Sequence, residues 1–244
     1  MNLNKLFLTN NDCYKAGKKI TVKGIMVHST GANNPWLKRY LPDDGKIGKN
    51  QYGNHWNTAR PGGAQVCVHG FIGKLANGTV ATYQTLPWNH RGWHAGGNAN
   101  NTHIGFEICE DGLNDRAYFE KVYKEAAELC AYLCKEYGLT EKDIIDHSEG
   151  YKKGIASNHG DVKHWFTKHG KSMDTFRADV KKLLSSASAP AVSKELTSVN
   201  DIVWELAHRG IITDKQLWLK KLETDSNSYW LARKTVKYLQ SKGV

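Results

Sequence analysis

Short apolar runs alternate with longer helical patterns over the first three quarters of the chain. Runs rich in β-branched and aromatic residues predict strands. Five such runs occur, at residues 20–28, 65–72, 79–85, 103–109 and 144–147. Between residues 115 and 137 the apolar residues recur every three or four positions, which predicts an amphipathic helix ending at Gly138, and a shorter helix is expected at 173–184. Together these elements predict an α/β fold in which a mixed central β-sheet is flanked by helices.

The composition changes after residue 184, where serine, alanine and proline become frequent, as is typical of a linker. Three more helical patterns follow, at 199–209, 214–222 and 229–240, with predicted N-caps at Ser198, Thr213 and Ser228. Each contains one tryptophan, which either builds the core of a small bundle or, where exposed, stacks on sugar rings. We therefore expect a large domain at 1–184, a linker at 185–197 and a small C-terminal three-helix domain at 198–244.

The composition is that of a globular protein, because 40% of the 244 residues are hydrophobic and no segment approaches the roughly 20 apolar residues of a membrane span. We expect no membrane insertion. The N-terminus lacks the apolar core and cleavage site of a secretory signal, so synthesis in the cytoplasm is expected. Five cysteines, an odd number, argue against a disulfide framework in such a chain. Cys67 and Cys109 lie in apolar runs and are predicted to be buried thiols.

The formal charge of +10 indicates an anionic partner or surface. The basic residues are dispersed, and no helix-turn-helix, zinc-finger or RNA-binding signature accompanies them. We therefore expect no nucleic-acid partner. Anionic cell-wall polymers would be attracted equally well, and charge alone does not choose between partners.

Three potential metal ligands lie at strand ends or in the loop that follows. His28 ends the first apolar run, His147 ends the last, and Asp161 follows fourteen residues later across a loop that contains glycine and asparagine. Catalytic zinc takes three protein ligands of these types and keeps one position open. The spacing is compatible with one zinc ion, although two histidines and an aspartate at such distances can also be unrelated.

Four motifs occur in an order that resembles a known enzyme family. They are Val27-His28-Ser29-Thr30, Gly92-Trp93-His94-Ala95-Gly96, Ile104-Gly105-Phe106-Glu107-Ile108, and His147 followed by His159-Gly160-Asp161. Over residues 20–185 the chain resembles the zinc-dependent N-acetylmuramoyl-L-alanine amidases of the type 2 family, which are related to peptidoglycan recognition proteins and phage endolysins. The resemblance implies His28, His147 and Asp161 as ligands of one zinc ion.

The same resemblance implies roles for five further residues. Glu107 matches a general base or water-positioning glutamate. His159 stands where many relatives have a lysine that stabilises the oxyanion, a task that an imidazole can also perform. The alternative is that His159 is itself the third ligand and Asp161 lies behind it. Trp93 and His94 match a loop beside the substrate, and His69 is a further candidate for substrate binding.

The sequence thus predicts an endolysin-like peptidoglycan hydrolase that cleaves the amide between N-acetylmuramic acid and the L-alanine of the stem peptide. The alternative is a non-catalytic peptidoglycan-binding protein of the same fold. The expected partners are bacterial peptidoglycan and anionic wall polymers, and the C-terminal domain is expected either to bind the wall or to mediate self-association. We expect synthesis in a host cytoplasm and action on the cell wall after release.

Overall fold

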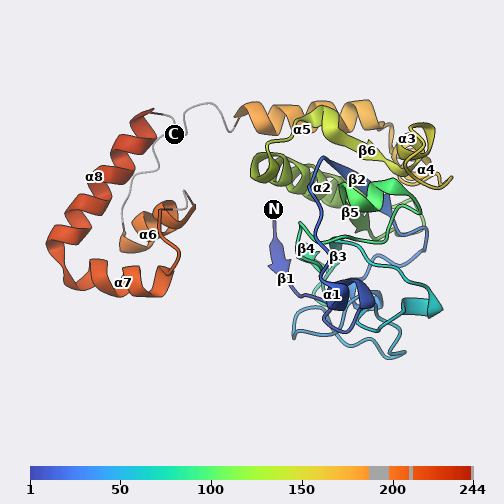
Figure 1. Ribbon diagram of the computed structural model, residues 1–244, viewed down its shortest axis with the longest axis horizontal. Helices are drawn as coiled ribbons and strands as arrows, with labels where there is room; N and C mark the ends of the chain where they lie inside the picture. The colour runs from blue at the N-terminus through green and yellow to red at the C-terminus, as the bar shows by residue number, and fades with distance from the viewer. Residues whose placement is uncertain (187–197, 209–210, 243–244) are drawn as a thin grey trace. The chain divides into compact units, whose positions relative to one another are not determined.

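The computed structural model describes residues 1–186, 198–208 and 211–242, so the predicted linker lies almost entirely outside the described residues. The chain divides into two compact units, Met1–Leu183 and Leu184–Val244 (Figure 1). Among the described residues, no helix combines the length and the apolar character that a membrane span requires.

Six strands form a single mixed sheet in the first unit (Figure 1). They are β1 (Leu3–Lys5), β2 (Gly24–Ser29), β3 (Gly70–Lys74), β4 (Val80–Gln84), β5 (His103–Ile108) and β6 (Ile144–Asp146). Their spatial order is β1-β4-β3-β5-β2-β6. β3 and β4 pair in the antiparallel direction across a turn at Gly78, where φ is 82°, and the other pairings are parallel. The predicted mixed sheet is confirmed.

The parallel strands β5, β2 and β6 bring three chain segments to one edge of the sheet. All six residues of β2 are buried, as expected for a strand with a neighbour on each side. In the register of the sheet His28 lies opposite Glu107 on β5, and Val27 lies opposite Asp146 on β6. Because parallel strands end at the same edge, their C-terminal residues are neighbours although the strands lie far apart in sequence.

Helix α2 (Arg116–Tyr137) packs against β3 and β4. Asp115 caps its first turn by accepting a hydrogen bond from the Tyr118 amide, and Gly138 ends it with a φ of 64°. The predicted helix therefore has the expected bounds. The other helices of this unit are α1 (Asp12–Ala16), α3 (His147–Lys152), α4 (Lys163–Phe166) and α5 (Met173–Ser186). Short 3-10 turns lie at Leu37–Arg39, Pro61–Gly63, Asn98–Asn101, Glu141–Asp143 and Thr167–His169.

Aromatic side chains connect α2 to α4 and α5. Phe119 meets the rings of Trp165 and Phe166 edge to face, with centroids 5.4 and 5.7 Å away, and Tyr123 contacts Phe176 in the same way at 5.3 Å. Edge-to-face contacts of this kind are favourable beyond the area that they bury. They fix the segment that follows Asp161 against the body of the unit.

One prediction about the cysteines is wrong. Cys13 and Cys67 form a disulfide across 54 residues, whereas Cys109, Cys130 and Cys134 are free and buried. Cys13 lies on α1, a five-residue helix that the apolar pattern does not predict, and this helix lies beside the chain that leads into β3. Two cysteines that are 54 residues apart in sequence come together only in the folded chain, so the number of cysteines could not reveal this pair.

The second unit contains α6 (Val199–His208), α7 (Lys215–Thr224) and α8 (Ser226–Lys242), which agrees with the predicted three helices. Its core is aliphatic, and the buried residues are Ile202, Val203, Leu206, Ile212, Leu222, Ala232 and Val236. Trp218 packs partly against this core, whereas Trp230 is 57% exposed. The side chain of Trp204 lies outside the described part of the chain.

Candidate metal centre and its pocket

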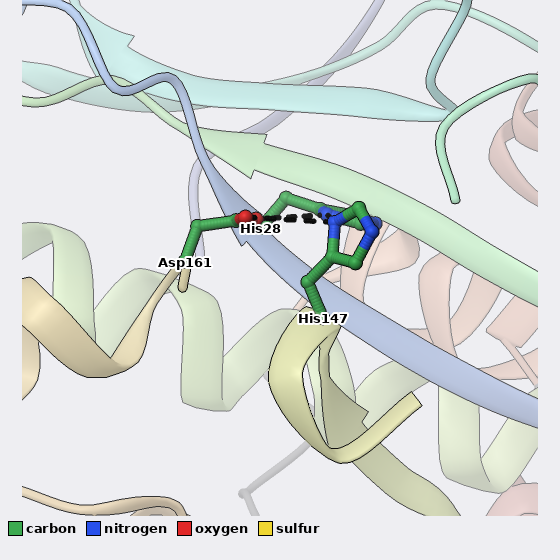
Figure 2. A group of neighbouring side chains, drawn as sticks. All are labelled: His28, His147 and Asp161. Atoms are coloured by element: carbon green, nitrogen blue, oxygen red, sulfur yellow. Dashed lines mark hydrogen bonds and ion pairs between the residues drawn. The ribbon is translucent and has the colours of Figure 1, made fainter. Parts of the chain in front are cut away.

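Three side chains converge at the edge of the sheet where β2 and β6 end. Figure 2 shows His28, His147 and Asp161 pointing toward one another. His28 Nδ1 lies 3.2 Å from His147 Nδ1 and 3.0 Å from an Asp161 carboxylate oxygen, and His147 Nδ1 lies 3.5 Å from the other oxygen. The structure therefore brings together the three predicted metal ligands. His159 does not belong to this group among the described residues.

Each of the two histidines is held by regular structure. His28 belongs to β2 and is 1% exposed. His147 is the first residue of α3, and Asp146 before it caps that helix by accepting hydrogen bonds from the Glu149 amide at 2.7 Å and the Ser148 hydroxyl. Glu149 in turn accepts two hydrogen bonds from Arg177 on α5. The position of His147 is thus fixed by a strand end, a capping box and an ion pair.

Asp161 is tied to His147 through the backbone as well as the side chain, because the His147 amide donates to the Asp161 carbonyl oxygen at 3.2 Å. Burial disfavours the charged form of the Asp161 carboxyl. The hydrogen bonds and the charges of His147 and His28 outweigh that effect and hold its pKa well below the usual range. Burial also lowers the pKa of His28, although Asp161 opposes the shift. The surroundings of Asp161 consequently favour its charged carboxylate form.

This donor set fits a zinc ion. Two imidazole nitrogens and a carboxylate facing one another at 3.0–3.5 Å would repel unless a proton or a cation lay between them. A tetrahedral zinc ion with bonds of about 2.1 Å separates its ligand atoms by about 3.4 Å. The separations between the three side chains fall around this value, so His28, His147 and Asp161 could hold such an ion.

A pocket of about 540 Å³ opens at the cluster. Besides the three converging residues, its lining includes the predicted site residues Trp93, His94, Glu107 and His159. His159 is exposed and stacks on His147, with the ring centroids 4.7 Å apart. Trp93 is 37% exposed, and the Arg91 guanidinium lies over its ring at 4.6 Å. An imidazole and an indole therefore border the space beside the three converging atoms.

Glu107 is a half-buried acid in the lining of this pocket. Its Oε2 atom has no hydrogen-bond partner among the described residues. Burial raises the pKa of the Glu107 carboxyl well above its usual value, and the negative charges of Asp161 and Glu110 raise it further. A carboxyl that is short of partners and shares a pocket with three potential metal ligands is suited to accept and return a proton.

Two histidines that are predicted to bind substrate, His69 and His94, form hydrogen bonds within the protein. His69 is fully buried, and its ring nitrogens are used by the backbone: Nδ1 accepts from the Gly105 amide at 3.0 Å and Nε2 donates to the His90 carbonyl at 2.8 Å. The His69 side chain does not line the pocket and both its ring nitrogens are bonded to backbone, so these contacts lend no support to the prediction that His69 binds substrate. His94 borders the pocket, but its Nδ1 atom lies 2.9 Å from His28 Nε2.

Sequence reasoning did not single out Ser157, Glu110 or His164 for this site. Ser157 lies 3.2 Å from His147 Nε2. His164 Nε2 and Glu110 Oε1 are 3.0 Å apart at the pocket wall, and Glu110 also accepts a hydrogen bond from the Gly31 amide. Serine and glutamate are common on surfaces, so only the contacts of the folded chain distinguish these residues.

Comparison with known proteins agrees with this geometry. The family model described as N-acetylmuramoyl-L-alanine amidase matches residues 18–163, which is more than half of the chain and includes all three converging side chains. The chain belongs to the N-acetylmuramoyl-L-alanine amidase family. The matched region accordingly includes strands β2 to β6, α2, and the loop that carries Asp161, whereas β1 lies outside it.

Curated relatives match this amidase domain over part of their length. A probable N-acetylmuramoyl-L-alanine amidase from Bacillus licheniformis is 33% identical over 132 residues, which are 52% of this chain and 32% of the relative. The N-acetylmuramoyl-L-alanine amidase XlyA of Bacillus subtilis strain 168 is 38% identical over 68 residues, 27% of this chain and 22% of the relative. The chain therefore spans about a third or less of the length of these relatives.

Solved structures share the fold. The catalytic domain of XlyA superposes with a TM-score of 0.51 at 22% identity, covering 74% of this chain and 99% of that domain. Staphylococcus aureus hydrolase AmiA, in complex with its ligand, gives a TM-score of 0.51 at 19% identity, with coverage of 75% and 82%. At these identities the likeness establishes the architecture of the amidase domain, including the mixed sheet that was predicted.

Proposed function

We propose that this protein is a zinc-dependent hydrolase of the amide bond between N-acetylmuramic acid and the L-alanine of the peptidoglycan stem peptide. The observation that carries the proposal is that His28, His147 and Asp161 converge in the same pocket as Glu107, whose Oε2 atom has no hydrogen-bond partner among the described residues. A binding protein has no need of such a carboxyl beside a complete ligand set. Family membership supplies the class of substrate.

His28, His147 and Asp161 would hold one zinc ion. When bound, zinc acts as a Lewis acid toward the amide carbonyl and makes water a nucleophile near neutral pH. Glu107 would take the proton from the attacking water and return it to the leaving nitrogen of L-alanine, which is the exchange that a raised pKa favours.

His159 and Trp93 would act on the substrate. An N–H of His159, at the exposed rim beside His147, would donate to the negative oxygen that develops on the attacked carbonyl. Trp93 would pack its exposed ring against the sugar or the peptide stem. These residues, unlike His28, have surfaces that a polymer could reach from outside.

The reaction is tested by incubating the full chain with purified peptidoglycan, with and without a chelator. We expect chelator-sensitive release of free L-alanine amino groups without new reducing sugar ends, restored by added zinc. New reducing ends would instead indicate a glycosidase. Retained binding to the wall with no amine released would favour the non-catalytic binding protein.

The C-terminal unit would hold the enzyme on the wall. Trp230, Leu231 and Tyr238 are each more than half exposed on α8, and the Lys234 ammonium lies 4.0 Å over the Trp230 ring. Aromatic rings beside a cation suit a sugar polymer with anionic groups. A tethered wall binder raises the substrate concentration at the catalytic unit.

Binding of the intact Trp230→Ala chain to purified cell walls tests this targeting role. We expect weaker binding with unchanged hydrolysis of a soluble fragment. The matched control is Tyr52→Ala, which removes an exposed aromatic ring of the amidase unit. Unchanged wall binding together with a loss of dimer in sedimentation would assign this face to self-association.

A further inference from the structure

The loop of residues 92–103, called here the backing loop, lies behind both histidines of the metal centre. We propose that His94 on this loop, and Ser157 bonded to it, are positioning residues that fix the orientation and the protonated nitrogen of His28 and His147. The inference rests on the zinc site proposed above. It assigns to His94 a task other than substrate binding and gives Ser157 a role.

In the hydrogen bond between His28 and His94, His28 is the donor. His94 Nε2 lies 3.2 Å from the His103 carbonyl oxygen, which can only accept, so a neutral His94 carries its proton on Nε2. The Nδ1 atom of His94 then has a lone pair, and it lies 2.9 Å from His28 Nε2. His28 must donate there, which leaves the lone pair of its Nδ1 atom directed at Asp161 and His147. That lone pair is what a metal ion binds.

His147 is oriented in a similar way, through Ser157, by Ala95, which follows His94 in the loop. Ser157 Oγ lies 3.2 Å from the carbonyl oxygen of Ala95 and donates its proton to it. The hydroxyl oxygen can then accept from His147 Nε2, also at 3.2 Å. His147 Nδ1 is left to face the cluster. Two backbone carbonyls, at positions 95 and 103, thus determine which nitrogen each histidine presents.

The backing loop is built to seat the His94 ring. The buried Asn100 side chain accepts hydrogen bonds from the amides of His94 and Ala95 at 2.8 and 2.9 Å. A Cβ atom at Gly92 would lie 2.9 Å from His94 Cδ2, and one at Gly105 would overlap the ring. Glycine at both positions leaves the space that the imidazole occupies.

Zinc affinity, measured by competition with a chromophoric chelator, tests the proposal without reference to activity. We expect His94→Phe and Ser157→Ala each to weaken zinc binding by about 10- to 100-fold, because the partners of metal-bound histidines have effects of this size. His94→Asn keeps an acceptor near the position of Nδ1 and should recover much of the loss. Asn98→Ala, an exposed position of the same loop, is the matched control.

Two further measurements separate positioning from a loss of fold. Thermal unfolding of the zinc-free variants should change little for Ser157→Ala, and the visible spectrum of the Co²⁺-loaded His94→Phe chain should differ from that of the unaltered chain. Zinc affinities within twofold of the unaltered chain in both His94→Phe and Ser157→Ala would overturn the proposal. So would His94→Asn binding zinc as weakly as His94→Phe. An unaltered chain that binds no zinc would instead refute the metal site itself.

Discussion

Glu107 is the residue whose chemistry depends most on its surroundings. Its carboxyl is buried, one oxygen has no partner among the described residues, and burial with two nearby acids raises its pKa. Glu107→Gln keeps the shape and removes the base. We expect the rate of amide hydrolysis to fall by about 10²- to 10⁴-fold, measured with a soluble muramyl peptide.

The zinc content of the Glu107→Gln chain should remain that of the unaltered protein, because Glu107 lies outside the group of three converging ligands. This control distinguishes loss of a base from loss of the metal. A decrease in rate of less than about fivefold, at full zinc occupancy, would mean that another group accepts the proton.

Residue types and their order predicted the converging side chains, but not what the histidines around them contact. His28, His147 and Asp161 could be selected because strand ends and a motif order mark them. His69 and His94 lie in equally suggestive positions, yet one bonds only to backbone and the other to His28. An imidazole can bind a ligand or form hydrogen bonds within the protein. Which of the two it does depends on backbone carbonyl groups that are distant in sequence.

At the level of elements, α3 links the fold to the metal centre. The helix has only six residues, so its stability depends on its cap and on Arg177. Asp146→Ala removes the acceptor for the Glu149 amide and should lower the free energy of unfolding by about 0.5–2 kcal/mol. Zinc affinity should fall as well, because His147 is the first residue of the helix. Denaturant unfolding of the zinc-free chain measures the first effect.

Asp146→Asn is the matched variant for this prediction, since asparagine caps helices about as well as aspartate. It should retain most of the stability that Asp146→Ala loses. Equal losses in the two variants would show that the charge of Asp146, rather than its hydrogen bond, supports the helix.

The long periodic helix α2 could be predicted from sequence, whereas the two short elements at the N-terminus could not. The bounds of α2 agree with its apolar spacing and its two caps. β1 and α1, with three and five residues, are too short to show a period. The predicted strand at 20–28 begins only at Gly24, because Lys19 and Ile20 pair with His90 and Asn89 instead of the sheet. Helix α7 is capped by Asp214, one residue after the predicted Thr213.

The chain divides into two compact units, and the proposed metal site belongs to only one of them. The amidase unit contains the cluster of His28, His147 and Asp161, whereas no such group occurs among the described residues of the C-terminal unit. The three helices of that unit enclose a separate aliphatic core. Because a ligand stabilises only the state that binds it, zinc should affect the two units unequally.

Calorimetry of the full chain with and without a chelator tests whether zinc stabilises one unit and not the other. Zinc at 100 times its dissociation constant adds about 2.7 kcal/mol to the stability of the unit that binds it. For a domain of this size, removing zinc should lower its midpoint by roughly 5–10 °C. The transition of the helical unit should not move. In the His28→Ala chain the chelator should shift neither transition, whereas equal shifts of both in the unaltered chain would show that the metal links the two units.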